Sequence, residues 1–112
     1  MQGETDACHE EQTDMYIQLY DCFLNDFKKE FSKYLKNCTF IDGGISNKWP
    51  CWEKLNNAKK EYAQKHDDCV YIDTIAEGLT TEKEPHEGVD WMHYDSDCVI
   101  QLGHLFADNI KF

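Results

Sequence analysis

An apolar residue recurs at every fourth position over the first third of the chain. The pattern spans about residues 10–36 and consists of Met15, Leu19, Phe23, Phe27, Phe31 and Leu35, widened by Tyr16, Tyr20 and Leu24. Such spacing is typical of an amphipathic helix whose apolar face lies in a core. Acidic residues precede the stripe and lysines follow it, which suits the helix dipole, and Asn37 is a suitable end. The sequence therefore predicts one long helix with a packed aromatic stripe.

Two short apolar runs further along the chain have the length and composition of buried strands. The first covers residues 39–41 and ends in a turn over residues 42–44, and the second covers residues 69–73. The polar stretch over residues 74–89 is expected to be a long surface loop. Loops of this length are uncommon unless they serve a functional site.

A second helix is expected between the two strands, from Pro50 to about Lys65. Proline suits the first turn of a helix, and Ser46 or Asn47 are nearby capping candidates. The expected core face of this helix consists of Trp52, Leu55, Tyr62 and Ala63.

The last helix is expected from Ser96 or Asp97 to Ile110, with Ser96 as its cap. Gly103 lies inside it and costs about 1 kcal/mol relative to alanine, so close packing on a sheet is the expected reason for this glycine. The residues expected to point inward are Val99, Leu102, Phe106 and Ile110.

The order helix, strand, helix, strand, loop, helix is that of a parallel α/β layer fold. Parallel sheets are covered on both faces and usually have about five strands, so two strands do not make a stable sheet of this kind. The sequence therefore predicts part of a larger α/β domain.

The charge balance excludes several classes of function. The chain has 22 acidic and 11 basic residues, a formal net charge of -11, and all of its basic residues are lysines. Binding to a phosphate backbone needs a basic face, and fork-shaped recognition of phosphate or carboxylate needs arginine. Neither nucleic acid nor a membrane is an expected partner. The chain as given carries no basic-then-apolar leader, so a cytoplasmic location fits it, and a secreted or periplasmic one would need a preceding signal.

Six cysteines are present without any Cys-x-x-Cys pair, which disfavours zinc-finger and thioredoxin-type sites. Free thiols are favoured over disulfides. For Cys8 and Cys98, a structural role is favoured over a nucleophilic one. His9, His86 and His93 lack the spacing of metal ligands. We therefore expect no metal and no cofactor.

Two polar blocks near opposite ends of the chain carry the chemistry. One is Gln2-Gly3-Glu4-Thr5-Asp6, and the other is Asp90-Trp91-Met92-His93. An aspartate three residues before a histidine can accept the Nδ1 proton and leave Nε2 as a base, which is the orienting half of a nucleophilic triad. A surface pair is the alternative for such a short motif. A glycosidase-type carboxylate pair, such as Glu4 with Asp90, depends on a separation that the sequence leaves open.

Together these blocks resemble the sialate O-acetylesterase-like carbohydrate esterases, a branch of the SGNH hydrolases. The resemblance rests on residues 2–7, on residues 90–96 and on their order, and Tyr71-Ile72-Asp73-Thr74, Glu84-Pro85 and Leu102-Gly103 also fit. It covers essentially the whole chain. It implies a three-layer α/β/α sandwich with a parallel sheet, and hydrolysis of acetyl esters on sugars such as sialic acid or xylan by a Ser-His-Asp triad.

The resemblance also implies roles for individual residues. His93 would be the general base and Asp90 the residue that orients it. Gln2 falls in the block that donates a side-chain amide to the oxyanion hole, and Gly3, Glu4 and Asp6 belong to the same active-site loop. Of the tryptophans, Trp91 is the candidate for stacking on a sugar ring, because it lies between Asp90 and His93.

The chain departs from the family in one respect, because it has no Gly-x-Ser nucleophile block. Its serines are Ser32, Ser46 and Ser96, and none follows a strand in the pattern of a nucleophile elbow. Residues 1–112 are therefore expected to be the C-terminal half of a single esterase domain, inactive alone. The expected partners are an acetylated carbohydrate and either the missing half or a second copy. The alternative is a non-catalytic acidic α/β module that binds a partner chain.

Overall fold

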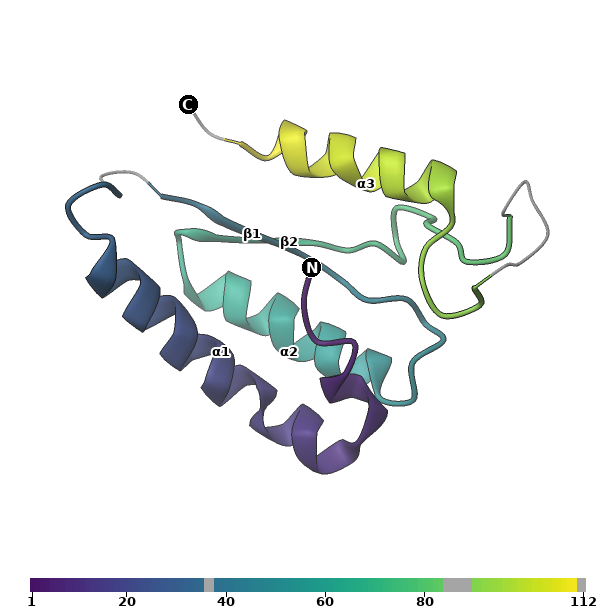
Figure 1. Cartoon of the computed structure of the whole chain (residues 1–112), viewed down its shortest axis with the longest axis horizontal. Helices are drawn as coiled ribbons and strands as arrows, with labels where there is room; N and C mark the ends of the chain where they lie inside the picture. The colour runs from purple at the N-terminus through teal and green to yellow at the C-terminus, as the bar shows by residue number, and fades with distance from the viewer. Residues whose placement is uncertain (36–37, 84–89, 111–112) are drawn as a thin grey trace.

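A computed structural model describes residues 1–35, 38–83 and 90–110 of the chain. Its centre is a two-stranded parallel sheet of β1 (Phe40–Gly43) and β2 (Cys69–Ile72), paired in register from Phe40 with Cys69 to Gly43 with Ile72. Helices α1 (Glu10–Glu30) and α2 (Trp52–Lys65) lie on one side of the sheet and α3 (Ser96–Asp108) on the other (Figure 1). The α/β class with parallel strands is confirmed.

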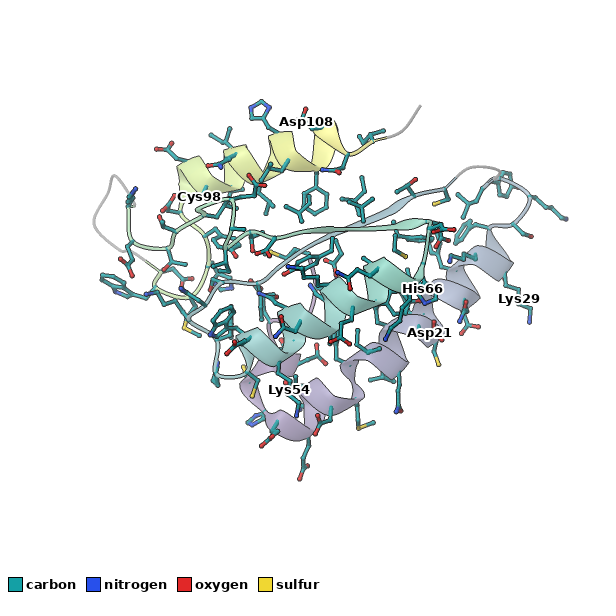
Figure 2. The ribbon with its side chains drawn as sticks, turned by 180° about the vertical axis from the view of Figure 1, so that it is seen from behind. Asp21, Lys29, Lys54, His66, Cys98 and Asp108 are labelled. Atoms are coloured by element: carbon teal, nitrogen blue, oxygen red, sulfur yellow. The ribbon has the colours of Figure 1, made fainter. Side chains whose placement is uncertain are left out.

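Each face of the sheet carries its own apolar core. On the α3 side, the buried residues are Ile72, Leu79, Tyr94, Cys98 and Leu102. On the side of α1 and α2, they are Ala7, Tyr16, Ile45 and Leu55. Figure 2 shows the first core from behind, with side chains filling the space between the strands and α3, on which Cys98 and Asp108 are labelled. Within the described residues, the three layers are therefore joined by packing on both sides of two strands.

The first helix is shorter than expected and buries a different face. It ends at Glu30, and the expected end at Asn37 lies outside the described residues. Met15, Leu19 and Phe23 are 55%, 56% and 59% exposed, and Phe31 is also exposed, so the expectation that this stripe is packed core is wrong for these residues. The buried apolar residues of this helix are Tyr16 and Leu24, from the residues that widen the stripe. The exposed stripe and the buried residues form two neighbouring apolar rows on α1. The strands and α2 together are too narrow to cover both rows.

The second helix starts later than the sequence indicates. It begins at Trp52, and the preceding residue, Cys51, makes no side-chain capping bond. Ser46 and Asn47 are therefore not its caps. Leu55 and Tyr62 are buried as expected, while Trp52 and Ala63 are half-buried.

Three expectations for α3 and its surroundings are wrong. Its cap is Asp95, whose side chain accepts from the backbone N–H of Cys98 at 3.1 Å, and Ser96 is the first helical residue. Leu102 and Phe106 face the sheet, but Val99 and Ile110 are exposed. A Cβ at Gly103 would meet nothing within 4 Å, whereas one at Gly43 would lie 3.4 Å from Phe106. The close approach of helix and sheet therefore occurs at the strand glycine.

The segment after β2 is less exposed than the sequence indicates. Thr74, Leu79 and Thr81 are buried, whereas residues 76–78 and 82–83 are exposed, so residues 74–83 form a loop that three buried side chains anchor. Residues 84–89, the rest of the expected loop, lie outside the described part. Within the described residues, none of the helices combines the length and the apolar character that crossing a membrane requires.

Candidate active site

The chemistry-bearing residues gather where the two parallel strands end. Residues 44–46 follow β1, Thr74 follows β2, and residues 90–95 lead into α3 at the same end of the sheet (Figure 1). Ligand sites of open α/β sheets form at this edge, outside the carboxyl ends of the strands.

Asp90 and His93 form a directly hydrogen-bonded pair. The Oδ2 atom of Asp90 lies 2.5 Å from Nδ1 of His93, and Oδ1 accepts from the backbone N–H groups of Met92 at 3.0 Å and of His93 at 3.4 Å. An aspartate that accepts from the backbone two and three residues ahead closes a tight turn. The local sequence therefore folds the carboxylate back onto its own histidine.

The electrostatics of the pair favour charge on both partners. The hydrogen bond from Asp90 raises the pKa of His93, the charges of Glu4 and Asp90 add to this rise, and partial burial opposes it. The same hydrogen bond to His93 lowers the pKa of Asp90. With Nδ1 donating to Asp90, the lone pair of the neutral imidazole resides on Nε2. The side chain of His93 is 54% exposed, so part of the ring contacts solvent.

Glu4 brings the N-terminal segment to the other nitrogen of the imidazole. Its Oε2 atom lies 3.6 Å from Nε2 of His93, across 89 positions of sequence. Gly3 allows this approach, because its φ is +104° and a Cβ there would lie 2.9 Å from the side chain of Leu55. Glu4 and Asp90 therefore flank opposite nitrogens of one imidazole and are not a free carboxylate pair.

Two other residues of the N-terminal block lie beside α1. Gln2 and Asp6 line a hollow of about 310 Å³ together with Tyr16, Leu19, Tyr20 and Phe23 of α1. The two ends of the chain therefore meet through Glu4. The role of Gln2 as an oxyanion donor stays a prediction.

Two residues that the sequence analysis did not place in the site lie against it. The ring of Trp49 packs edge-on against His93, with the ring centroids 5.6 Å apart, whereas Trp91 is largely exposed. The hydroxyl of Ser46 donates to the backbone carbonyl of Met92 at 2.5 Å. The signal that would have found both is their position just after a predicted strand, at the edge where sites form.

A buried polar network fixes the loop on its other side. The hydroxyl of Tyr94 donates to Oγ1 of Thr74 at 2.7 Å, and Thr74 donates to the carbonyl of Gly44 at 2.9 Å. Burial raises the pKa of Tyr94 to about 12, which keeps its hydroxyl protonated as a donor at neutral pH. The segments after both strands are thus tied to the residue next to His93.

Two of the cysteines make structural contacts. All six cysteines are free thiols, and the two that stand near the motifs in sequence have structural contacts. Cys8 donates to the carbonyl of Glu4 at 3.6 Å, and the buried Sγ of Cys98 accepts from the backbone N–H of Thr80 at 3.2 Å. Over residues 1–35, 38–83 and 90–110, there is no group of three or more side chains that could hold a metal ion. His86 falls outside these ranges.

An exposed imidazole oriented by a carboxylate is the base that hydrolases with a nucleophilic mechanism use. The chain matches the family model described as "Carbohydrate esterase, sialic acid-specific acetylesterase" over residues 1–111. No curated protein and no solved structure matches it. Because the family match covers nearly the whole chain, this protein belongs to that carbohydrate esterase family.

Proposed function

We propose that this chain supplies the acid–base part of a carbohydrate O-acetylesterase, with His93 as general base and Asp90 as its orienting carboxylate. The observation that carries the proposal is the 2.5 Å contact between Nδ1 of His93 and Oδ2 of Asp90. Membership of the carbohydrate esterase family supports ester hydrolysis as the reaction.

In the proposed reaction, a serine hydroxyl attacks the acetyl carbonyl while Nε2 of His93 takes its proton. The tetrahedral intermediate then collapses, His93 returns the proton to the departing sugar oxygen, and an acetyl-enzyme remains. Water activated by His93 releases acetate and restores the serine. Asp90 holds the imidazole in the tautomer that both half-reactions need. The nucleophile approaches Nε2 from the side where Glu4 now lies 3.6 Å away.

The serine is proposed to come from a segment outside these 112 residues, so that residues 1–112 form the C-terminal half of one esterase domain. None of the three serines of the chain is a candidate for the nucleophile. Ser32 is exposed just after α1, Ser46 is buried and engaged with the Met92 carbonyl, and Ser96 is the first residue of α3. Gln2 is the proposed oxyanion donor, and one such donor contributes about 3–4 kcal/mol to the transition state.

Charge supports an uncharged acetylated sugar as the preferred substrate. Glu4 and Asp90 flank His93, and the chain carries a formal net charge of -11 with no arginine. A negative field lowers the local concentration of anionic substrates. We therefore expect acetylated neutral sugars, such as those of xylan, to be preferred over a sialate, and Trp91 offers an exposed ring for stacking.

The test is an esterase assay with an activated acetate ester such as 4-nitrophenyl acetate. The 112-residue chain alone is expected to show no turnover that depends on His93. Joined to the coding segment that precedes it, and provided that this segment carries a Gly-x-Ser block, the protein is expected to hydrolyse the ester. His93→Ala should then reduce kcat on the order of 10⁴-fold or more. His104→Ala, a change of the same kind on the exposed side of α3, is the matched control.

Two results would contradict the proposal. One is full activity of the longer protein after His93→Ala. The other is turnover by the 112-residue chain alone that disappears with His93→Ala, because the nucleophile would then lie within this chain.

The outward face of α1 supports a second role, binding of a partner chain. Met15, Leu19 and Phe23 are each more than half exposed in one row of the helix. Neighbouring exposed apolar residues of this kind mark interaction surfaces. The missing half-domain and a second copy are the two partners proposed for this row.

Light scattering after size exclusion separates these partners. If the row binds a second copy, the mass exceeds 13.2 kDa and falls to that value with Leu19→Lys or Phe23→Lys. Ile100→Lys on α3 is the control, since this residue is equally exposed on the opposite layer. A mass of 13.2 kDa at every concentration would contradict self-association and leave the missing half as the partner.

A further inference from the structure

We propose that Ser46 is a positioning residue for His93, because its hydroxyl holds the peptide that joins Met92 to His93. The catalytic value of this contact rests on the proposed function, whereas the contact itself belongs to the folded chain. Ser46 lies 46 positions before Met92 in the sequence, and no motif connects the two.

The peptide before His93 is held from both sides. The hydroxyl of Ser46 donates to its carbonyl oxygen at 2.5 Å, and its N–H donates to Oδ1 of Asp90 at 3.4 Å. In a trans peptide, these two groups point in opposite directions. Rotation of the peptide plane therefore breaks both hydrogen bonds together. Because the plane sets the direction of the Cα–Cβ bond of His93, the hydroxyl indirectly aims the imidazole.

Ser46 is itself rigidly placed. It is 2% exposed, and the preceding residue, Ile45, is bound by the side chain of Asn56 on α2. That amide accepts from the Ile45 N–H and donates to the Ile45 carbonyl, both at 2.9 Å. A chain of contacts thus runs from α2 through residues 45 and 46 to the loop that carries His93.

The same segment also contacts the imidazole directly. Trp49, three residues after Ser46, packs its ring edge-on against His93. The charged groups that face the imidazole are Asp90 on Nδ1 and Glu4 on Nε2. A change in the orientation of the ring alters its distance to both carboxylates. The pKa of His93 therefore depends on the position of the ring.

A purely structural role would make a different prediction. If Ser46 only satisfies a buried carbonyl, its removal lowers the stability of the fold and leaves the Asp90–His93 contact intact. If Ser46 positions His93, its removal also weakens that contact. The pKa of His93 separates these two roles, because the Asp90 hydrogen bond is the main cause of its rise.

The experiment is an NMR titration of the histidine rings in the 112-residue chain, comparing wild type, Ser46→Ala and Asp90→Asn. We expect Ser46→Ala to lower the pKa of His93 in the same direction as Asp90→Asn, and by less. Ser32→Ala is the matched control, because this serine is exposed just after α1.

An unchanged pKa of His93 in folded Ser46→Ala would overturn the proposal. If Ser46→Ala does not fold, as judged by circular dichroism, Ser46→Cys takes its place, because it nearly preserves the volume with a weaker donor. The same criterion then applies to that variant.

The titration contains no catalytic step, so its result is independent of the proposed function. A shifted pKa together with an inactive longer protein would support the positioning contact and contradict the esterase proposal. In an active longer protein, Ser46→Ala should lower kcat roughly 10- to 100-fold with KM unchanged, because misplacement of a catalytic group acts on the chemical step.

Discussion

The carboxyl end of the sheet and the outward face of α1 differ in how completely the chain covers them. At the sheet end, hydrogen bonds link the segments after β1 and β2 to the loop of residues 90–95, through Ser46, Thr74 and Tyr94. On α1, Leu19 and its neighbours in the exposed row contact solvent although they are apolar.

The difference shows which part of the protein is complete by itself. The loop with Asp90 and His93 has its supports within the chain, so the acid–base pair can form without another polypeptide. The exposed row of α1 has apolar surface whose burial would be favourable at about 25 cal/mol per Å². The exposed row of α1 is therefore the surface that the proposed partner would cover, whereas the Asp90–His93 contact forms within the chain.

The largest expected effect compares two leucines on the same helix. Leu24 is 2% exposed and Leu19 is 56% exposed. Leu24→Ala should lower the free energy of unfolding by about 2–5 kcal/mol, because it leaves a cavity. Leu19→Ala should change it by less than about 0.5 kcal/mol in the isolated chain. Urea denaturation measures both, and equal losses would mean that the exposed row is buried in solution.

A second comparison uses two glycines. A Cβ at Gly44 would lie 2.6 Å from the hydroxyl of Tyr71 and 2.8 Å from Oγ1 of Thr74, whereas one at Gly103 would meet nothing within 4 Å. Gly44→Ala should therefore destabilise the protein by about 1–3 kcal/mol, because it overpacks the network. Gly103→Ala should stabilise it by up to about 1 kcal/mol, because it removes a glycine from a helix interior. Thermal unfolding of the two variants should move in opposite directions, and a stabilised Gly44→Ala would show that the network is loose.

A third test removes one hydroxyl from the network. Tyr94→Phe loses the donor to Thr74 at 2.7 Å and keeps the ring in the core. The expected loss of unfolding free energy is about 1 kcal/mol, the usual net value of one hydrogen bond. Chemical denaturation measures it, and Tyr34→Phe on the exposed segment after α1 is the control. A loss no larger than that of the control would mean that the network does not hold the loop.

The smallest expected effect on stability concerns the pH dependence of the Asp90–His93 pair, because both side chains are more than half exposed and water screens their charges. The raised pKa of His93 contributes stability that is fully present at pH values below the pKa of this histidine in the unfolded chain. This contribution is lost as the pH rises through the pKa of His93 in the folded chain. The lowered pKa of Asp90 contributes stability at pH values above the pKa of this aspartate in the unfolded chain. This contribution is lost as the pH falls through the pKa of Asp90 in the folded chain.

Asp90→Asn should therefore be less stable than wild type at about pH 5.5, and the difference should shrink at about pH 9. Denaturation at the two pH values measures this change, and a difference that grows with pH would contradict the charge pairing. In an active longer protein, base catalysis needs neutral His93, so activity should fall on the acidic side at a pH above the ordinary histidine value.

Much of the fold follows from local patterns. The helices over residues 52–65 and 96–108 and both strands appear near their expected places, because periodicity and glycine or proline boundaries act over a few residues. Strand β1 continues through Asp42 to Gly43, where the sequence indicates a turn, because pairing with β2 extends it. The helix cap is Asp95 and not Ser96, a difference of one residue.

In the candidate site too, some contacts follow from the local sequence and others depend on the tertiary structure. The contact of Asp90 with His93 needs only a turn of four residues, so the spacing indicated it. The family resemblance placed the two blocks in one site, but only the structure shows that Glu4 is the residue that lies near Nε2. Ser46 and Trp49 were missed, because their roles depend on where the segment after β1 lies relative to the loop before α3.

The amino-acid sequence by itself determined the order of helices and strands, the parallel α/β class and the Asp90–His93 pair, because each depends on neighbours within a few positions. The tertiary structure alone decided which row of α1 is buried, which side chain of the N-terminal block reaches His93, and that Ser46 supports it. The physical reason is that burial and contacts between distant segments depend on the area and position of the covering layers. A local pattern specifies that a face is apolar, but not whether anything covers it.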